Sequence, residues 1–515
     1  MKEGFIMKNM QQGRGNGGLG GIVFFLGLAF LSQIHAQFPD KATVYLDSMK
    51  QVIRGFGGAN IVGWRPDMTP EQIDKAFGTE EDQIGLSILR LRIPPDIASF
   101  DVNIPSAQQA YALGATIIAS PWTPPAWMKT NNSLIGGRLI DDNYQDYSEH
   151  LSYFVDFMES HDVQIYAVSI QNEPDANVNY ESCYWNTSEM RQFLIEEGPY
   201  IGAKLIVPEA QGFNKALSDP ILNDEEAAEN VAIIGGHLYG GGLEPYPLCE
   251  SKGKEVWMTE HSQEETTWAA ALYTGKEIHD CMIYGMSAYV FWYLVRYYGP
   301  IGEDGNVTKR GYVMSQFSKF VRPGYFRIAA TDYPQRQVYL TAYQGNSRLI
   351  IVVLNTARSD KEQTFQIENL GSGLSALTPY ITSETKDCVE GSQIWVEDGL
   401  FTVTLDASSV TTLVGSGISS KADAMVRPQM FRLYQNFPNP FNPATTIKYN
   451  LARSGHVILR IYNTSGQEMA TLINGFQSAG EHELNWRPGW LPSGRYLYRL
   501  QADEFSDTKQ LILLK

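Results

Sequence analysis

Short runs of apolar, β-branched and aromatic residues recur between residues 42 and 292, and stretches with helical spacing separate them. Residues 144–160 form the clearest helical pattern, because Tyr147, Leu151, Phe154 and Met158 recur at intervals of three or four. Further helices are predicted over residues 189–197 and 267–283. The predicted strands are residues 42–53, which lead into GFGGAN (55–60), then 84–93, 115–119, a run starting at residue 165, 204–207, 233–238, 256–259 and 288–292. Strands alternating with helices over this length predict an α/β fold, a parallel (β/α)8 TIM barrel.

The pattern changes near residue 325, after which short strands and turns replace the helical stretches. Strands are predicted over residues 338–343, 348–355, 364–367 and 400–405, which indicates a side β-sandwich attached to the barrel. A polar stretch, GSGISSKADAMVRP (415–428), has the composition of a linker. The strands predicted beyond it, including 456–463 and 494–502, are enough for one small all-β sandwich.

The N-terminus has the pattern of a secretory signal peptide. Lys2, Lys8 and Arg14 precede an apolar run over residues 22–31, and the small residue Ala36 follows. That run is too short to span a bilayer. We therefore predict a signal peptide over 1–36, a side sandwich from 37–54 and 325–416, a catalytic barrel over 55–324, a linker over 417–430 and a C-terminal β-domain over 431–515.

Composition and charge narrow the possible partners. The chain has a formal net charge of −17 and a pI of about 5.0, which disfavours binding to nucleic acid phosphates. The same charge does not oppose a neutral or weakly acidic polysaccharide. Cys183, Cys249, Cys281 and Cys388 lack the spacing of a metal site, and both one disulfide and isolated thiols remain open.

Two glutamates follow runs that are typical of buried parallel strands. Glu173 lies in IYAVSIQNEPD and Glu260 lies in EVWMTEH, each where the apolar run stops. Barrels of this class keep their chemistry at the C-terminal strand ends. We therefore expect both carboxyls to face one cleft, which is the minimum equipment for hydrolysing a glycosidic bond. The alternative is that either glutamate is a salt-bridged core residue.

Glu173 is expected to act as general acid and then general base, and Glu260 as nucleophile. In a retaining glycosidase the two carboxyls are roughly 5–5.5 Å apart, and a covalent glycosyl-enzyme forms. Asn172, directly before Glu173, is an amide suited to hydrogen-bonding the sugar hydroxyl next to the reacting carbon.

The sequence around these glutamates resembles glycoside hydrolase family 30 of clan A, in its bacterial xylanase branch. The resemblance covers roughly residues 40–415 and follows GFGGAN, GLSILRLRI, ASPWTPPAWMKTNN, VSIQNEPD, PEAQGF, SDPILND, GHLYG, WMTEH and the segment starting WYLVRYYGPIGEDGN, in that order. It implies a retaining endo-β-1,4-xylanase that needs no metal or organic cofactor. Another family 30 activity is an alternative: a β-glucosidase, a β-1,6-glucanase or an exo-xylosidase. A second alternative is that the chain is not an enzyme but a surface protein that only binds polysaccharide.

The resemblance also assigns substrate-binding residues, each of which has core packing as its alternative. Trp64 and Trp122 match aromatic walls of the glycone subsites, and Trp292 and Tyr239 match the floor beside the reacting sugar.

Arg296 and Tyr298 match a pair that recognises a glucuronic acid branch on xylan, for which a guanidinium is well suited. The alternative is an arginine in a surface ion pair. The chain departs from the family in HSQEETTW (261–268), where Ser262 replaces a tyrosine and Glu264 and Glu265 add negative charge. Acids facing that subsite would repel a uronate.

The C-terminal unit resembles the sorting domain of type IX secretion cargo. The segments concerned are NFPNPFNPATTIKYNL, IYNTSGQEMATL and SGRYLYRLQADEFSDTKQLILLK. This implies passage through the periplasm and then release or attachment at the outer cell surface, with plant cell-wall xylan and the secretion machinery as partners. A carbohydrate-binding module is the alternative for this unit.

Overall fold

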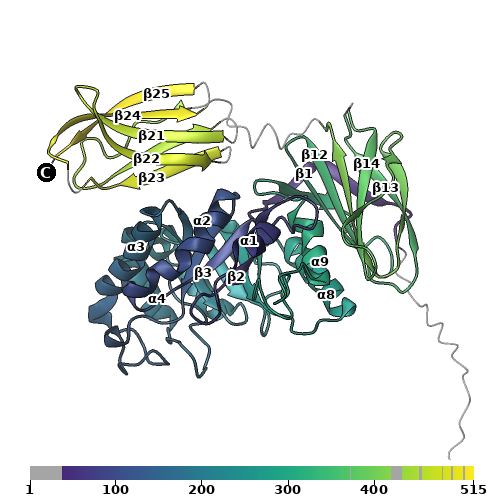
Figure 1. Ribbon diagram of the computed structural model, residues 1–515, viewed down its shortest axis with the longest axis horizontal. Coiled ribbons are helices and arrows are strands. Elements are labelled where there is room, and N and C mark those ends of the chain that lie inside the picture. Colours follow the sequence, from purple (N-terminus) through teal and green to yellow (C-terminus); the bar gives the residue numbers. More distant parts are fainter. Residues whose placement is uncertain are drawn as a thin grey trace, which may run out of the picture. The chain divides into compact units, whose positions relative to one another are not determined.

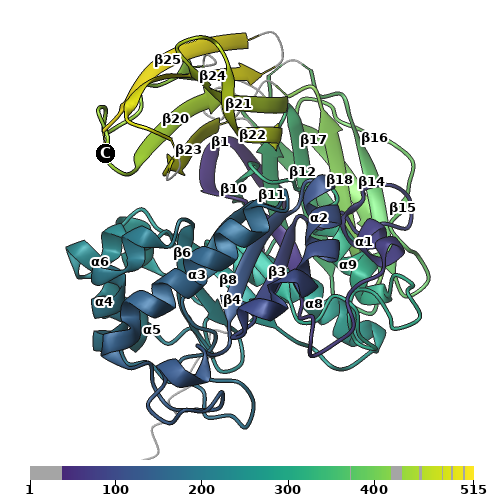
Figure 2. The same ribbon diagram turned by 60° about the vertical axis from the view of Figure 1, so that its left-hand side comes forward.

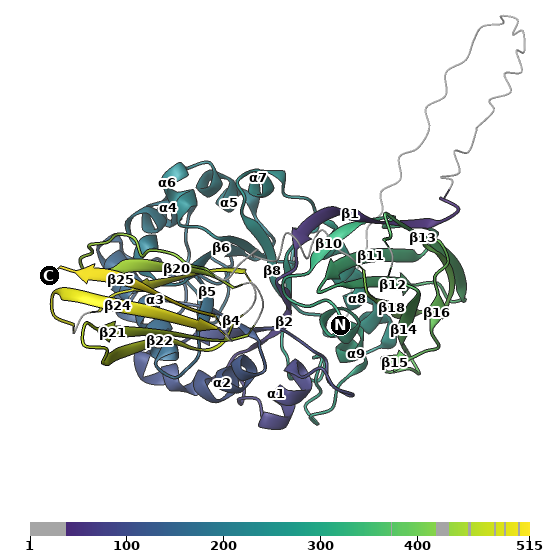
Figure 3. The same cartoon turned by 90° about the horizontal axis from the view of Figure 1, so that it is seen from above.

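Eight parallel strands form a closed barrel, as the alternation of strands and helices predicts, and Figure 3 labels β2, β4, β5, β6 and β8 among them. The computed structural model describes residues 38–371, 373–418, 432–451, 455–477, 480–488, 491–502 and 505–514. The barrel strands are β2 (Gly55–Asn60), β3 (Ile88–Ile93), β4 (Thr116–Pro121), β5 (Ile165–Ser169), β6 (Lys204–Ala210), β7 (Ile233–His237), β8 (Glu255–His261) and β9 (Ala288–Phe291). Each strand pairs in parallel with the next, and β9 closes the barrel on β2.

Helices surround the barrel, and Figures 1 and 2 show α1–α4 and α3–α6 respectively on its outside. Thr69, Asn186, Thr267 and Thr308 cap α1, α4, α8 and α9 with their side chains, so these helices begin where the sequence supplies an N-cap residue. The helices are α1 (Pro70–Phe77), α2 (Ile104–Ala112), α3 (Tyr144–Glu159), α4 (Thr187–Glu196), α5 (Lys215–Leu222), α6 (Glu225–Glu229), α7 (Pro247–Ser251), α8 (Trp268–Ile283) and α9 (Lys309–Ser318). Short 3-10 turns are η1 (Ile97–Asn103), η2 (Ala126–Met128), η3 (Asp141–Asn143) and η4 (Gly198–Tyr200).

The apolar run over 84–93 is strand only in its second half. Ile84 and Leu86 donate backbone hydrogen bonds to Lys75 and Ala76 at the end of α1, so they pack outside the barrel before β3 begins at Ile88. Gly85 between them has a φ of +76°, which turns the chain. Both halves are buried, and hydrophobicity alone therefore does not separate them.

The barrel interior is filled in layers. An apolar cluster of strand residues, including Ile118, Ile206 and Trp257, forms one layer. Polar and charged side chains follow nearer the C-terminal strand ends, and these include Arg90, Glu209 and His237, all buried. Filled layers of this kind leave the chemistry to the C-terminal mouth of the barrel.

The attached β-domain is a curled sheet of ten strands in the order β15-β14-β18-β12-β11-β10-β1-β13-β17, with β16 paired to β14. It encloses its own core, which includes Val44, Leu340, Phe365 and Leu413. Gln316 of α9 donates to Thr382 of β14 at 2.7 Å and joins the sheet to the barrel helices. The strands are β1 (Ala42–Val52), β10 (Phe326–Ala330), β11 (Val338–Gly345), β12 (Arg348–Asn355), β13 (Lys361–Glu368), β14 (Ala376–Ser383), β15 (Val389–Glu390), β16 (Ile394–Trp395), β17 (Leu400–Leu405) and β18 (Ser409–Ser416).

The C-terminal unit consists of two sheets around a shared core that includes Ile447, Leu459 and Tyr498. One sheet has the order β19-β20-β23 and the other β22-β21-β24-β25. The strands are β19 (Arg432–Leu433), β20 (Thr445–Leu451), β21 (Gly455–Asn463), β22 (Glu468–Gln477), β23 (Gly480–Trp486), β24 (Gly494–Ala502) and β25 (Phe505–Leu513).

Two sequence predictions fall wholly or largely on residues that the structure does not describe. The predicted signal peptide, 1–36, lies outside the described residues, as does the predicted linker except for Gly417 and Ile418. Among the helices that are described, none has the length and apolarity to cross a membrane. The four cysteines are free thiols, and Cys388 alone of them is part-exposed.

Candidate active site

Glu173 lies just beyond the C-terminal end of β5, and its backbone is tied to both neighbouring strands. The Asn172 amide donates to the Pro121 carbonyl of β4 at 2.8 Å, and the Glu173 amide donates to the Glu209 carbonyl of β6 at 3.0 Å. Glu173 has a φ of +45°, in the left-handed region that a non-glycine residue adopts only when its surroundings hold it there. The side chain is 6% exposed and accepts a hydrogen bond from the Tyr180 hydroxyl at 3.4 Å.

Glu260 is the penultimate residue of β8, and both of its carboxylate oxygens are engaged. Oε2 lies 2.6 Å from Nη1 of Arg90, and Oε1 accepts from the Tyr239 hydroxyl at 3.0 Å. The side chain is 8% exposed. These two contacts fix the carboxylate from the barrel interior and from the loop after β7.

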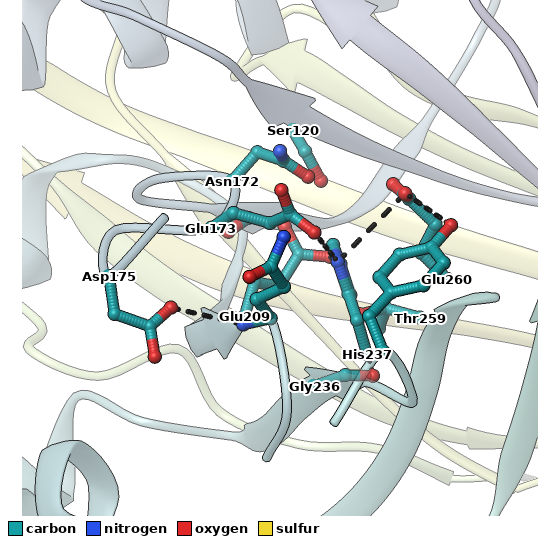
Figure 4. A network of polar contacts seen from close by, with 12 residues as sticks. Ser120, Asn172, Glu173, Asp175, Glu209, Gly236, His237, Thr259 and Glu260 are labelled. Atoms are coloured by element: carbon teal, nitrogen blue, oxygen red, sulfur yellow. Dashed lines mark hydrogen bonds and ion pairs between the residues drawn. The ribbon is translucent and has the colours of Figure 1, made fainter. Parts of the chain in front are cut away.

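Glu173 and Glu260 share one site (Figure 4), with His237 of β7 beside both. His237 Nδ1 lies 3.0 Å from Glu173 Oε1 and 4.0 Å from Glu260 Oε1. A carboxylate oxygen of each glutamate and the imidazole nitrogen all lie within 4.8 Å of one another. Inverting glycosidases hold their two carboxyl groups about 6.5–9.5 Å apart to leave room for a water molecule, whereas here one oxygen of each carboxylate lies within 4.8 Å of the other.

Arg90 of β3 joins the site from below and is fully buried. Besides Glu260, its Nη2 donates to Asn172 Oδ1 at 2.6 Å and lies 3.3 Å from Glu209 Oε1. Its Nε donates to Ser120 at 3.2 Å. Burial alone would lower the pKa of Arg90, but the charges of Glu209 and Glu260 outweigh it and raise the pKa, so the guanidinium stays charged.

Glu209 and His237 complete a buried charge network. Burial would raise the pKa of Glu209, but the charge of Arg90 and the nearby His237, whose Nε2 lies 3.9 Å from Glu209 Oε1, hold the pKa well below its ordinary value. For His237, burial would lower the pKa, but the charge of Glu260, the hydrogen bond to Glu173 and the proximity of Glu209 overcome this effect and raise the pKa to about 9. The imidazole is therefore protonated at neutral pH.

The raised pKa of His237 predicts a pH dependence of stability. The ordinary pKa of histidine is 6.5, so His237 binds its proton more tightly in the folded protein than in the unfolded chain. The resulting stabilisation is fully present below pH 6.5 and is lost as pH rises through about 9. We expect the urea midpoint of the wild type to fall between pH 6.5 and 9, and that of His237→Gln to fall less over the same range. Parallel declines of the two proteins would contradict this assignment.

Glu173, His237 and Glu260 could also be considered as metal ligands, because their ligand atoms lie so close together. A metal needs an unprotonated imidazole nitrogen. The neighbouring carboxylates raise the pKa of His237, which disfavours the unprotonated form, and Arg90 places a fixed positive charge 2.6 Å from Glu260. This donor set favours proton chemistry over binding of a cation.

Three of the predicted aromatic residues form a cluster next to the glutamates. The ring of Trp64 lies 5.3 Å from that of Trp122 and 6.5 Å from that of Trp292, and Tyr180 joins it at 5.8 Å. Trp122 is only 2% exposed, and the Arg90 guanidinium lies 4.9 Å from its ring. The half-buried Trp64 and Trp292 thus present the open surface of the cluster, and Trp122 supports them from behind.

Arg296 and Tyr298 both lie in the loop after β9, but Arg296 is part-exposed and Tyr298 is buried. Arg296 Nη1 lies 2.5 Å from Glu303 Oε1, and its guanidinium lies 5.2 Å from the ring of Tyr297. Tyr298 is 6% exposed and packs against Phe291. Glu264 accepts from the Tyr297 hydroxyl at 3.4 Å, which brings one of the extra acids to this loop.

Sequence reasoning gave no role to Arg90, Glu209, His237 or Tyr180. The first three lie in GLSILRLRI, PEAQGF and GHLYG, segments that support the family resemblance. A usable signal was present in each, because a charged or imidazole side chain in or directly after an apolar strand must find a buried partner. The sequence alone did not indicate which residue is the partner of each of these side chains.

Known proteins share sequence with both the barrel and the C-terminal unit. Residues 95–254 match the family model described as the glycosyl hydrolase family 30 TIM-barrel domain, and residues 435–514 match the secretion system C-terminal sorting domain. Glucuronoxylanase XynC of Bacillus subtilis (strain 168) is 41% identical over 387 residues, which are 72% of this chain and 91% of that protein.

Solved structures are also similar. The glycoside hydrolase family 30 subfamily 8 xylanase Xyn30A of Clostridium acetobutylicum has a TM-score of 0.70 and 38% identity, covering 74% of this chain and 100% of that one. A GH30 endoxylanase from Clostridium papyrosolvens C71 has a TM-score of 0.68 and 37% identity, covering 73% of this chain and 100% of that one.

Proposed function

This chain belongs to glycoside hydrolase family 30, and from that premise we propose that it is a secreted, retaining endo-β-1,4-xylanase acting on glucuronoxylan or arabinoxylan. The observation that carries the proposal is the placement of Glu173 and Glu260 in one buried site, where one carboxylate oxygen of each lies within 4.8 Å of the other. That spacing supports double displacement rather than direct attack by water.

In the first step, Glu260 attacks the anomeric carbon while Glu173 gives its proton to the departing glycosidic oxygen. The bond from that carbon to the leaving oxygen breaks, and an ester bond to Glu260 forms. In the second step, Glu173 takes a proton from water, the water oxygen attacks the same carbon, and Glu260 leaves. Two inversions at one carbon give net retention.

The surrounding residues prepare these steps. Arg90 and Tyr239 orient the Glu260 carboxylate, because each of them contacts one of its two oxygens. Asn172 Oδ1 is occupied by Arg90, so Nδ2 is the group that donates to the hydroxyl beside the reacting carbon. Trp64 and Trp292 provide flat apolar faces for the sugar rings, with Trp122 behind them.

Product analysis on polymers tests the proposal. An endo-xylanase should release a ladder of oligosaccharides from glucuronoxylan early in the reaction, and proton NMR should show the β-anomer forming first. Release of single xyloses from chain ends would favour an exo-xylosidase. Activity on β-1,6-glucan or aryl β-glucosides with none on xylan would favour another family 30 activity, and no activity on any of them would favour a polysaccharide-binding protein.

We further propose that Arg296 binds the carboxylate of a glucuronic acid branch. Replacing Arg296 with Ala is expected to lower kcat/KM on glucuronoxylan by about ten- to a hundred-fold, because a partly desolvated guanidinium–carboxylate contact is lost. On unbranched xylo-oligosaccharides the change should stay within about two-fold, because no carboxylate is present. Equal losses on both substrates would show that Arg296 does not contact the branch.

The protein is secreted or carried at the outer cell surface, because its C-terminal residues match a sorting domain of a secretion system. We propose that residues 431–515 are the signal recognised by that machinery, after residues 1–36 have been removed. Deleting 431–515 should leave activity on xylan in the cell and remove it from the medium and cell surface.

A further inference from the structure

The guanidinium proposed to bind the uronate already has a carboxylate partner within the chain. Arg296 Nη1 lies 2.5 Å from Oε1 of Glu303, seven residues further along the same loop. The Arg296 side chain is 22% exposed and the Glu303 side chain is 56% exposed. The pair therefore sits at the surface, with the arginine as the more sheltered partner.

The backbone around Glu303 is held without help from its side chain. Gly302 donates to the Asn306 carbonyl at 2.8 Å, and Gly305 donates to the Gly302 carbonyl at 2.9 Å. Asp304 accepts from the Asn306 amide at 3.0 Å and closes the same turn. The Glu303 carboxylate can consequently move away from Arg296 while the loop keeps its conformation.

The arginine side of the pair is also fixed independently. Arg310 of α9, 3% exposed, donates to the Tyr298 carbonyl and, at 2.7 Å, to the Glu265 carbonyl. It thereby joins the loop after β9 to the loop after β8. The ring of Tyr297 lies 5.2 Å from the Arg296 guanidinium, and this contact does not involve Glu303.

Under the proposed function, Arg296 has two alternative carboxylate partners: Glu303 within the chain and the uronate branch of the substrate. We propose that Glu303 is a specificity-determining residue: its carboxylate occupies Arg296 in the free enzyme, must be displaced by a uronate branch, and so reduces the preference for branched over unbranched xylan. This inference rests on the proposed function. With no uronate present, Glu303 satisfies Arg296, and an unbranched chain can be cleaved without leaving that cation unpaired.

The experiment compares wild type with Glu303→Gln, which keeps the side-chain shape and removes the charge. The quantity measured is the ratio of kcat/KM on glucuronoxylan to kcat/KM on unbranched xylo-oligosaccharides. We expect the ratio to rise about three- to five-fold, the amount by which an exposed ion pair of this kind competes. In an Arg296→Ala background the same Glu303→Gln change should leave the ratio unaltered.

Glu264→Gln is the matched control, because Glu264 is an acid of the same region that contacts Tyr297. It removes one negative charge without removing the partner of Arg296. A rise equal to that of Glu303→Gln would show a general charge effect and overturn the competition. An unchanged ratio for Glu303→Gln would also overturn the proposed competition. A lower ratio would overturn it as well, and would show that Glu303 positions Arg296. The same assay measures whether the wild type cleaves glucuronoxylan or the unbranched xylo-oligosaccharides at all. That result tests the proposed function, whereas the change in the ratio tests the role of Glu303.

Discussion

Replacing Glu260 with Gln is expected to lower kcat on xylan by about 10³-fold or more, with little change in the fold. An amide cannot form the glycosyl-enzyme, so the route through a covalent intermediate is lost. The amide oxygen still accepts hydrogen bonds and has the shape of the carboxylate, which keeps Arg90 and Tyr239 near their places. Reducing sugar released from glucuronoxylan measures the loss, with Glu264→Gln as a control in the segment after β8.

Azide rescue separates the roles of the two glutamates. In Glu260→Ala, azide can attack an activated aryl xyloside from the vacated side and give an α-glycosyl azide. In Glu173→Ala, Glu260 still forms the glycosyl-enzyme with a good leaving group, and azide then gives the β-product. Wild-type activity in Glu260→Gln would remove Glu260 from the mechanism, and reversed azide products would exchange the two roles.

Replacing Arg90 with Leu is expected to be the most damaging change to stability, at about 3–5 kcal/mol. The substitution leaves Glu209 and Glu260 buried without their shared cation, and uncompensated buried charge has a cost of that order. Urea unfolding followed by intrinsic fluorescence measures the change. Activity should fall as well, because Glu260 loses the contact that orients it.

Two further variants test the cause of this loss. Arg138→Leu removes a half-exposed arginine from its pair with Glu189 and should cost less than about 1 kcal/mol. Adding Glu209→Gln to Arg90→Leu should restore part of the stability, because one of the stranded charges is gone. An Arg90→Leu protein within about 1 kcal/mol of wild type would mean that the buried network does not depend on its cation.

Several features followed from local sequence patterns. Alternating apolar runs and helical stretches predicted the barrel, and the ends of two of those runs placed Glu173 and Glu260 at the same mouth. This works because parallel strands of a barrel end on one side, so position along a strand determines which face a residue reaches. The family resemblance and the C-terminal sorting domain were also evident from short motifs, and the comparisons confirm both.

The partners of the charged residues depended on the tertiary structure. Arg90 is 170 residues from Glu260 and 82 from Asn172 along the chain, and nothing local in ILRLRI indicates either contact. Trp122 looked like an open wall of the cleft and is instead covered by Trp64 and Trp292. Likewise Arg296 matched a uronate-binding pattern, but only the folded loop showed that Glu303 reaches it.

The sequence by itself therefore determined the alternation of strands and helices and the strand ends that carry Glu173 and Glu260, since backbone geometry and burial of apolar side chains act over a few residues. Which charges share a buried space was decided by the closed barrel, which brings distant strands within hydrogen-bonding distance. Coulomb energies and desolvation depend on that three-dimensional distance, and this is why the protonated state of His237 and the pairing of Arg90 could not be obtained from the order of residues.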